Sequence, residues 1–313
     1  MRIIVFVSRL NVEVQSQWLT MLKKQLTNET ILLPHQISES QVKDVDIAIV
    51  ANPDPKDLER FVNLVWVQSL WAGVERLIND LPRKQVKLVK LDDPQLSKTM
   101  AESVLAWTLY LQRNMPEYAQ QQNNKQWNQL PCVTSNELRV SILGAGKLGI
   151  AALGMLKKLD YQVSCWSRTK KQFNGISSYS SFSGLQKMLS KTDILINLLP
   201  LTQHTYHLLG KALLSELPTG AKLINFSRGA VVDMKGLLEL LETRHLSHAV
   251  LDVFEKEPLE SSDPIWSNTN ITVLPHISAP TNISSATKVV AQNIEKYREN
   301  NVIPNPVNVS AGY

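Results

Sequence analysis

Short apolar runs alternate with helical patterns along the chain. Four runs in the first hundred residues have the composition of buried strands, at residues 3–7, 46–50, 64–68 and 86–89. After the first run, Trp18, Leu19, Leu22 and Leu26 recur at helical spacing. This alternation predicts an α/β fold, in which crossover helices join the strands of a parallel sheet.

A second alternating series begins at Arg139. It predicts six further strands, at residues 140–143, 162–166, 194–198, 223–226, 249–253 and 271–273. Before it, a helical period predicts one long helix over residues 99–121, which Pro116 should kink or end, and a polar surface connection at residues 120–124. Residues 281–300 predict a last helix, with an apolar face of Val289, Val290, Ile294 and Tyr297.

The length of 313 residues exceeds what a single hydrophobic core usually serves, so we expect two domains. The two series place a cofactor-binding domain at residues 99–280. Residues 1–98 and 281–313 should together form a discontinuous second domain, which we assign to substrate binding.

Composition argues against several other classes of protein. The hydrophobic fraction of 43% is ordinary for a globular chain. The net charge of +5 is not gathered in a basic block and aromatic residues are sparse, so nucleic-acid binding is not expected. The apolar start of the chain is too short for a signal peptide, and no stretch reaches the ~20 apolar residues of a membrane span. We expect a soluble, cytoplasmic protein without a membrane partner.

The cysteines and histidines predict neither a disulfide framework nor a metal site. Cys132 and Cys165 are too few for such a framework, and we interpret Cys165 as a small buried side chain. No cluster of Cys, His and carboxylate residues has the spacing of metal ligands. Five histidines are interpreted as surface or capping residues: His35, His204, His207, His245 and His248.

A glycine loop follows the predicted strand at residues 140–143 and opens a helical stretch. Its sequence is Gly144-Ala145-Gly146-Lys147-Leu148-Gly149, which has the G-x-G-x-x-G form. In such loops one glycine makes the turn, one admits the pyrophosphate of a dinucleotide, and one allows close helix packing. Glycines also form ordinary strand-to-helix turns, but this position between strand and helix favours a dinucleotide site.

The end of the next strand indicates which dinucleotide is bound. An NAD site usually has an acidic residue there, which binds the ribose 2′-hydroxyl. Here Ser167, Arg168 and Thr169 occupy the position, and Arg168 can pair with a 2′-phosphate that a carboxylate would repel. The pattern favours NADPH, with NADH used more weakly. The alternative interpretation is a solvated, charged turn.

Three later residues supply an anion clamp, an acid and a carboxylate. Arg228 follows a predicted strand and can bind the carboxylate of a 2-keto acid while it polarises the carbonyl. His276 can give a proton to the carbonyl oxygen, and Glu257 can hold the other ring nitrogen and favour the imidazolium. Singly, each residue could equally be a surface charge or a cap. As an ordered set after a cofactor loop, they predict hydride transfer to a small 2-keto acid.

These motifs resemble a known family. The segments are Ile142–Gly146, Cys165–Thr169, Leu195–Pro200, Asp252–Phe254 and the terminal Gly312-Tyr313. They are similar to those of the D-isomer-specific 2-hydroxyacid dehydrogenases, and within that family to the glyoxylate/hydroxypyruvate reductase A type. The resemblance covers essentially the full length and is strongest over residues 139–280.

The resemblance implies a fold, a reaction and a set of site residues. The fold would be two Rossmann-like, doubly wound parallel-sheet domains with a cleft between them, in a homodimer. The family's catalytic positions fall on Arg228, Glu257 and His276, and its substrate loop on Trp71, Ala72 and Gly73. Its cofactor contacts fall on the glycine loop, on residues 167–169, and on Leu199, Pro200, Thr202, Phe226, Ser227 and Asp252. Core packing for Trp71 and turn capping for Asp252 remain open.

The substrate choice also comes from the resemblance. It implies reduction of glyoxylate to glycolate and of hydroxypyruvate to D-glycerate. The residue chemistry by itself leaves other 2-keto acids open, such as pyruvate or a keto-sugar acid. It also leaves open a protein of another class, which senses NAD(P) and docks partners without turnover.

Overall fold

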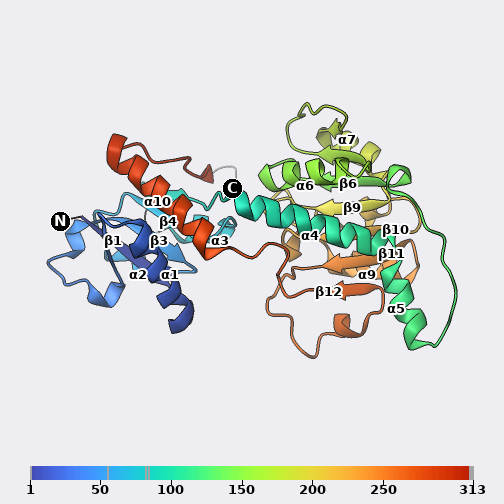
Figure 1. Ribbon diagram of the computed structural model, residues 1–313, viewed down its shortest axis with the longest axis horizontal. Helices are drawn as coiled ribbons and strands as arrows, with labels where there is room; N and C mark the ends of the chain where they lie inside the picture. The colour runs from blue at the N-terminus through green and yellow to red at the C-terminus, as the bar shows by residue number, and fades with distance from the viewer. Residues whose placement is uncertain (1, 55, 82, 84, 310–313) are drawn as a thin grey trace. The chain divides into compact units, whose positions relative to one another are not determined.

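The computed structural model describes residues 2–54, 56–81, 83 and 85–309 (Figure 1). Gly312 and Tyr313, which contributed to the resemblance, lie outside the described residues. The chain divides into two compact units, one made of Met1–Gln95 and Thr281–Tyr313 and the other of Leu96–Pro280. None of the helices in the described part of the chain has both the length and the apolar composition that a membrane span requires.

The first unit contains a five-stranded parallel sheet of order β2-β1-β3-β4-β5. Four of its strands confirm the predicted runs, and the three-residue β2 was not predicted because a single buried residue, Ile31, is too short a signal. The strands are β1 (Ile3–Ser8), β2 (Thr30–Leu32), β3 (Val45–Ala51), β4 (Trp66–Ser69) and β5 (Lys87–Val89). The helices of this unit are α1 (Val12–Gln25), α2 (Lys56–Glu59), α3 (Glu75–Asp80) and α10 (Ile283–Asn300).

The last helix returns to the first unit and completes its core. In Figure 1, α10 lies beside α1, and Ile294 and Tyr297 join Trp18 and Leu22 in one buried cluster. Arg298 anchors the helix further, because its guanidinium pairs with Glu29 at 2.7 Å and also with Asp46. The predicted helix of residues 281–300 and its apolar face are confirmed.

The second unit contains a seven-stranded parallel sheet of order β12-β11-β10-β9-β6-β7-β8. The strand order reverses between β6 and β9, which is the point where open α/β sheets bind ligands. The strands are β6 (Arg139–Leu143), β7 (Gln162–Trp166), β8 (Ser177–Tyr179), β9 (Ile194–Asn197), β10 (Ala221–Asn225), β11 (Leu246–Leu251) and β12 (Ile271–Val273). The helices are α4 (Pro94–Gln112), α5 (Met115–Asn123), α6 (Lys147–Lys157), α7 (Ser181–Leu189), α8 (Lys211–Leu214) and α9 (Met234–Glu242).

The central strands of this sheet are buried on both faces. Leu195, Leu223 and Leu251 face one apolar cluster, and Ile196 and Ile224 face another. Burial on both sides explains why these strands appear in the sequence as continuous apolar runs rather than alternating patterns. The edge strand β8, with the sequence Ser-Ser-Tyr, lacks such a run and was not predicted.

The position of the kink or end expected in the helix over residues 99–121 is wrong, because the break lies at residues 113–114 and not at Pro116. The structure has two helices, because Asn114 adopts the left-handed conformation (φ 53°) between α4 and α5. Pro116 therefore lies in the first turn of α5, where its missing N–H costs nothing, and does not kink a continuous helix. The expected surface connection at residues 120–124 is also wrong for most of its length, since α5 continues to Asn123.

The interpretation of His248 as a surface or capping residue is wrong as well. This side chain is buried on β11, where its Nε2 lies 2.9 Å from the hydroxyl of Thr272. Lys222 is its direct neighbour on β10. Burial, reinforced by the charge of Lys222, lowers the pKa of His248 to about 4.

We expect this histidine to make the protein less stable in acid. The unfolded chain binds a proton at the ordinary pKa of 6.5, whereas the folded chain binds it only near 4. The free energy of unfolding should therefore fall as the pH drops from 6.5 to 4, by a total of about 3 kcal/mol. His248→Gln removes the titration, so urea unfolding at pH 7 and pH 4.5 should show a smaller difference in the variant. An equal difference in both proteins would contradict this assignment.

Candidate functional site

Each candidate catalytic residue follows one of three neighbouring strands of the second unit. Arg228 follows β10, Glu257 follows β11 and His276 follows β12. These strands are adjacent and parallel, so their carboxyl ends lie along one edge of the sheet. The structure therefore brings all three predicted residues to the same edge, although 48 positions separate Arg228 from His276 in the sequence.

The imidazole of His276 is paired with the carboxylate of Glu257. Nδ1 of the ring lies 2.8 Å from Oε2, while Oε1 of Glu257 accepts the backbone N–H of Phe254 at 2.9 Å. Both carboxylate oxygens are engaged, which fixes the carboxylate and, through it, the ring. The His276 side chain is 52% exposed, so the ring remains accessible to a reactant. The pairing leaves Nε2 as the nitrogen for proton exchange.

Asp252 holds the turn that carries His276. His276 itself has a positive φ of 56°, which is uncommon for a residue with a side chain. The fully buried carboxylate of Asp252 accepts the backbone N–H groups of Ile277 at 2.7 Å and Ser278 at 2.8 Å, and its carbonyl accepts that of His276 at 3.0 Å. These bonds show that Asp252 caps the turn. A role of Asp252 beside a cofactor stays a prediction.

Two asparagines, which sequence reasoning missed, order the segment before Arg228. Nδ2 of Asn197 donates to Oδ1 of Asn225 at 2.9 Å, and Nδ2 of Asn225 donates to the carbonyl of Arg228 at 3.2 Å. Both side chains are buried, so these bonds form without competition from water. A signal was present in the sequence, because each asparagine ends a strand directly after two apolar residues. The half-buried Arg228 also donates from Nη1 to the carbonyl of Ser227 at 2.7 Å.

The three glycines of the glycine loop differ in the space around them. Gly144 has a positive φ of 100°, and a Cβ there would lie 2.7 Å from the carbonyl oxygen of Leu198. A Cβ on Gly149 would meet the carbonyl oxygen of Gly144 at 1.9 Å. In contrast, a Cβ on Gly146 would meet no atom within 4 Å. Open space thus lies at the N-terminus of α6, where Lys147 and Leu148 begin the helix and its backbone N–H groups can bind phosphate.

The segment after β7 adds positive charge near this loop. Nζ of Lys171 donates to the carbonyl of Ala145 at 2.8 Å. Sequence reasoning missed this contact, because nothing in the local pattern around Lys171 points to a loop 26 positions away. Arg168 and Thr169 are exposed, and the Ser167 hydroxyl donates to the carbonyl of Thr169 at 2.9 Å.

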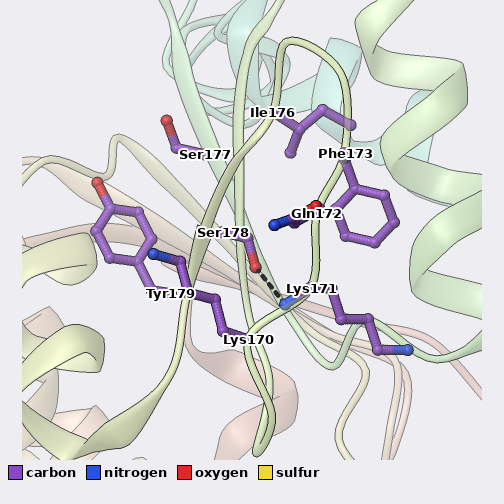
Figure 2. A pocket seen from close by; sticks show the side chains of 8 residues that line it. All are labelled: Lys170, Lys171, Gln172, Phe173, Ile176, Ser177, Ser178 and Tyr179. Carbon is purple, nitrogen blue, oxygen red and sulfur yellow. Dashed lines mark hydrogen bonds between the residues drawn. The ribbon is translucent and has the colours of Figure 1, made fainter.

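A pocket of about 380 Å³ lies beside this segment (Figure 2). Lys170, Lys171 and Tyr179 line it, and Figure 2 shows the backbone N–H of Lys171 bonded to the hydroxyl of Ser178. Two lysines and several hydroxyl groups make its lining suited to an anionic group.

The remaining predicted cofactor residues differ in exposure. Leu199, Phe226 and Ser227 are buried, and the Ser227 hydroxyl donates to the carbonyl of Leu199. Pro200 and Thr202 are partly exposed in a turn closed by Thr205. The contacts of these five residues with a cofactor stay predictions.

The predicted substrate loop lies in the first unit, between β4 and α3. Trp71 packs edge-to-face on Trp18 with ring centroids 6.1 Å apart, and its Nε1 donates to Oδ1 of Asn52 at 3.0 Å. Trp71 and Gly73 also line a small pocket of about 70 Å³. Trp71 thus combines core packing with a place on a pocket wall, and Ala72 and Gly73 are partly exposed. Across the described part of the chain, no three His, Cys, Asp or Glu side chains gather as metal ligands would.

Comparison with known proteins decides the family. The sequence model of the "D-isomer specific 2-hydroxyacid dehydrogenase, NAD binding domain" matches residues 105–278. The chain is also 35% identical to glyoxylate/hydroxypyruvate reductase A from Yersinia enterocolitica, over 95% of this chain and 96% of that protein. The chain belongs to the D-isomer specific 2-hydroxyacid dehydrogenase family.

Solved structures of other 2-hydroxyacid dehydrogenases have the same fold as this dehydrogenase. One from Xanthobacter autotrophicus Py2, in complex with NADPH and MES, has a TM-score of 0.92 at 31% identity, covering 100% of this chain and 99% of that one. An NADPH-dependent glyoxylate/hydroxypyruvate reductase from Sinorhizobium meliloti, in complex with NADP and sulfate, has a TM-score of 0.89 at 26% identity over the full length of both chains. The expectation of two Rossmann-like parallel-sheet domains is confirmed.

Proposed function

We propose that this dehydrogenase reduces small 2-keto acids with NADPH, converting glyoxylate to glycolate and hydroxypyruvate to D-glycerate. The observation that carries the proposal is the 2.8 Å pair of His276 and Glu257, on the same sheet edge as Arg228. The choice of substrate is supported by the name of the relative from Yersinia enterocolitica.

The residues present fit a dinucleotide. The open space at Gly146 and the N-terminus of α6 would hold the pyrophosphate, with Gly144 and Gly149 shaping the turn. Arg168 would hold the 2′-phosphate, with support from the lysines beside it. When bound, the nicotinamide ring supplies the hydride that reaches the substrate carbonyl carbon.

Arg228 and His276 act on different groups of the substrate. The guanidinium of Arg228 binds the carboxylate and polarises the adjacent carbonyl through its planar fork of donors. The His276 imidazolium gives its Nε2 proton to the carbonyl oxygen as negative charge develops there. Glu257 accepts the Nδ1–H, so the ring keeps one orientation and the proton to be transferred stays on Nε2.

The test is an assay of NADPH and NADH oxidation with glyoxylate and, in parallel, hydroxypyruvate. Rapid loss of NADPH absorbance with both acids supports the proposal. Turnover confined to pyruvate or a keto-sugar acid would replace the substrate assignment. Partner capture without turnover on any keto acid would favour the NAD(P)-sensing binding protein instead.

Arg168→Ala should remove the preference for NADPH. Loss of the guanidinium should raise the KM for NADPH about 10- to 100-fold, as expected for a charge-assisted contact worth about 1.5–3 kcal/mol. The KM for NADH should change little, because NADH has no 2′-phosphate. Steady-state kinetics with both cofactors would measure this, and Arg244→Ala, at an exposed arginine on the same unit, is the control. Equal effects on both cofactors would contradict the role of Arg168.

We also propose a homodimer that uses the surface of α4, α5 and the segment after them. Trp127 is 96% exposed there, and Leu109, Met115 and Tyr118 are exposed nearby along the chain. Light scattering should report twice the chain mass of 35.2 kDa. Trp127→Asp combined with Met115→Asp should shift the protein to a monomer, whereas Val12→Asp, on the first unit, should not. A monomeric wild-type protein would contradict the proposal.

A further inference from the structure

The glycine after Arg228 lies in direct backbone contact with the turn that carries Glu257. A Cβ on Gly229 would lie 2.0 Å from the carbonyl carbon of Phe254, 2.3 Å from the amide nitrogen of Glu255 and 2.4 Å from the carbonyl oxygen of Phe254. Such separations are far inside van der Waals contact, so no other residue type fits there without movement. The neighbours are backbone atoms, which cannot rotate aside as a flexible side chain would.

The turn on the Arg228 side of this contact is held firmly. The backbone N–H of Val231 bonds to the carbonyl of Arg228 at 3.2 Å, and that of Val232 bonds to the carbonyl of Gly229 at 3.0 Å. Val231 is fully buried, and its carbonyl accepts the backbone N–H of Leu209 at 3.0 Å.

The turn on the other side is held more loosely. Glu255 is exposed, and its carboxylate contacts two surface side chains, Tyr206 at 3.3 Å and His207 at 3.6 Å. A side chain added at Gly229 would therefore displace the turn of Phe254 to Glu257. That turn fixes the carboxylate of Glu257 through the N–H of Phe254, and the carboxylate in turn holds the ring of His276.

We propose that Gly229 is a positioning residue for the reaction: its missing side chain lets the Glu257 turn rest on the Arg228 turn. This contact sets the separation between the group that binds the substrate carboxylate and the group that donates the proton. The inference rests on the proposed function for its kinetic consequences, but the contact itself predicts a structural effect that can be measured without turnover.

The first experiment compares Gly229→Ala with Glu257→Gln. A displacement of about 1 Å can lower kcat by about 10²-fold, so we expect that loss in Gly229→Ala with an unchanged Kd for NADPH. Both variants weaken the support of the imidazolium, so the alkaline limb of the pH–rate profile for reduction should move toward lower pH in each. The double variant should be hardly worse than the worse single one, because both changes act on the same pair.

Gly236→Ala is the matched control. A Cβ at Gly236 would lie 2.6 Å from the backbone nitrogen of Lys211, where α9 meets α8 in the same unit. This variant also introduces a clash with backbone, milder than the one at Gly229, away from the three candidate residues. We expect it to lower stability while the pH–rate profile keeps its position. If Gly229→Ala behaves like Gly236→Ala, the positioning role is overturned.

Two further measurements keep the test decisive. If Gly229→Ala does not fold, Phe254→Leu replaces it, because this change loosens the same turn from its buried side. An unmoved alkaline limb of the pH–rate profile in Phe254→Leu would overturn the inference. If the wild-type protein reduces no keto acid, the proposed function fails. NMR of the His276 ring nitrogens then decides the inference, which stands if Gly229→Ala loses the Nδ1 hydrogen-bond signal and fails if that signal is unchanged.

Discussion

His276→Ala should lower kcat for glyoxylate reduction about 10³-fold, the usual scale for loss of a general acid. Without the imidazolium, the carbonyl oxygen would have to take its proton from water as negative charge develops on it. The pair with Glu257 at 2.8 Å shows that the ring is already oriented before substrate binds. The Kd for NADPH should change little, because the glycine loop and the segment after β7 remain intact.

Stopped-flow reduction together with fluorescence titration of NADPH would separate these two effects. His35→Ala is the control, since this histidine lies on the first unit. Near wild-type turnover in His276→Ala would show that another group donates the proton. A large loss of NADPH affinity would instead indicate that the variant disturbs the cofactor domain.

Arg228→Lys should lower kcat/KM for glyoxylate by roughly 10²–10³-fold, although the positive charge is kept. A lysine ammonium cannot make the two parallel hydrogen bonds that the guanidinium fork makes with a carboxylate, and it is a poorer electrophile toward the adjacent carbonyl. The carbonyl of Arg228 accepts a bond from Asn225, and Nη1 of Arg228 donates to the carbonyl of Ser227 at 2.7 Å. The backbone and the guanidinium are both ordered by these bonds, and a shorter, more flexible cation loses that order. Arg228→Ala should remove nearly all turnover.

The matched control for Arg228→Lys is Arg244→Lys, at an exposed position of the same unit. Steady-state kinetics with glyoxylate would report kcat and KM separately, and circular dichroism would verify the fold. If Arg228→Lys retained wild-type kcat/KM, a simple positive charge would suffice and the bidentate binding of the carboxylate would be wrong.

The sequence predicted the strands well where burial requires a run of apolar residues. Ten of the twelve strands in the described part of the chain coincide with predicted apolar runs, because parallel strands are covered on both faces. The missed strands β2 and β8 have three residues each and lie at the edges of their sheets, where pairing with a neighbour rather than burial defines the strand. A break near Pro116 was expected, but its position at Asn114 was missed, because it depends on the backbone conformation of one asparagine.

The identity of the candidate residues came from the sequence, but their contacts did not. The residue types and order of Arg228, Glu257 and His276 led to the proposed chemistry, which stays a prediction. The bond between Glu257 and His276 joins side chains 19 positions apart, and it forms only because β11 and β12 are neighbours in the sheet. No pattern of spacing encodes such a bond, since strand order is a property of the whole sheet.

The same distinction applies to residues whose role depends on what surrounds them. Local sequence led to the interpretation of His248 as a surface or capping residue, left Asp252 open between a cofactor contact and a turn cap, and gave no sign that Gly229 meets another turn. Tertiary packing buries His248 beside Lys222, brings the amides of the His276 turn onto Asp252, and places the Phe254–Glu255 peptide against Gly229. The sequence by itself thus determined which elements form and which chemical groups are available. Only the tertiary structure decided which of those groups meet, because burial and contact arise between segments that are distant along the chain.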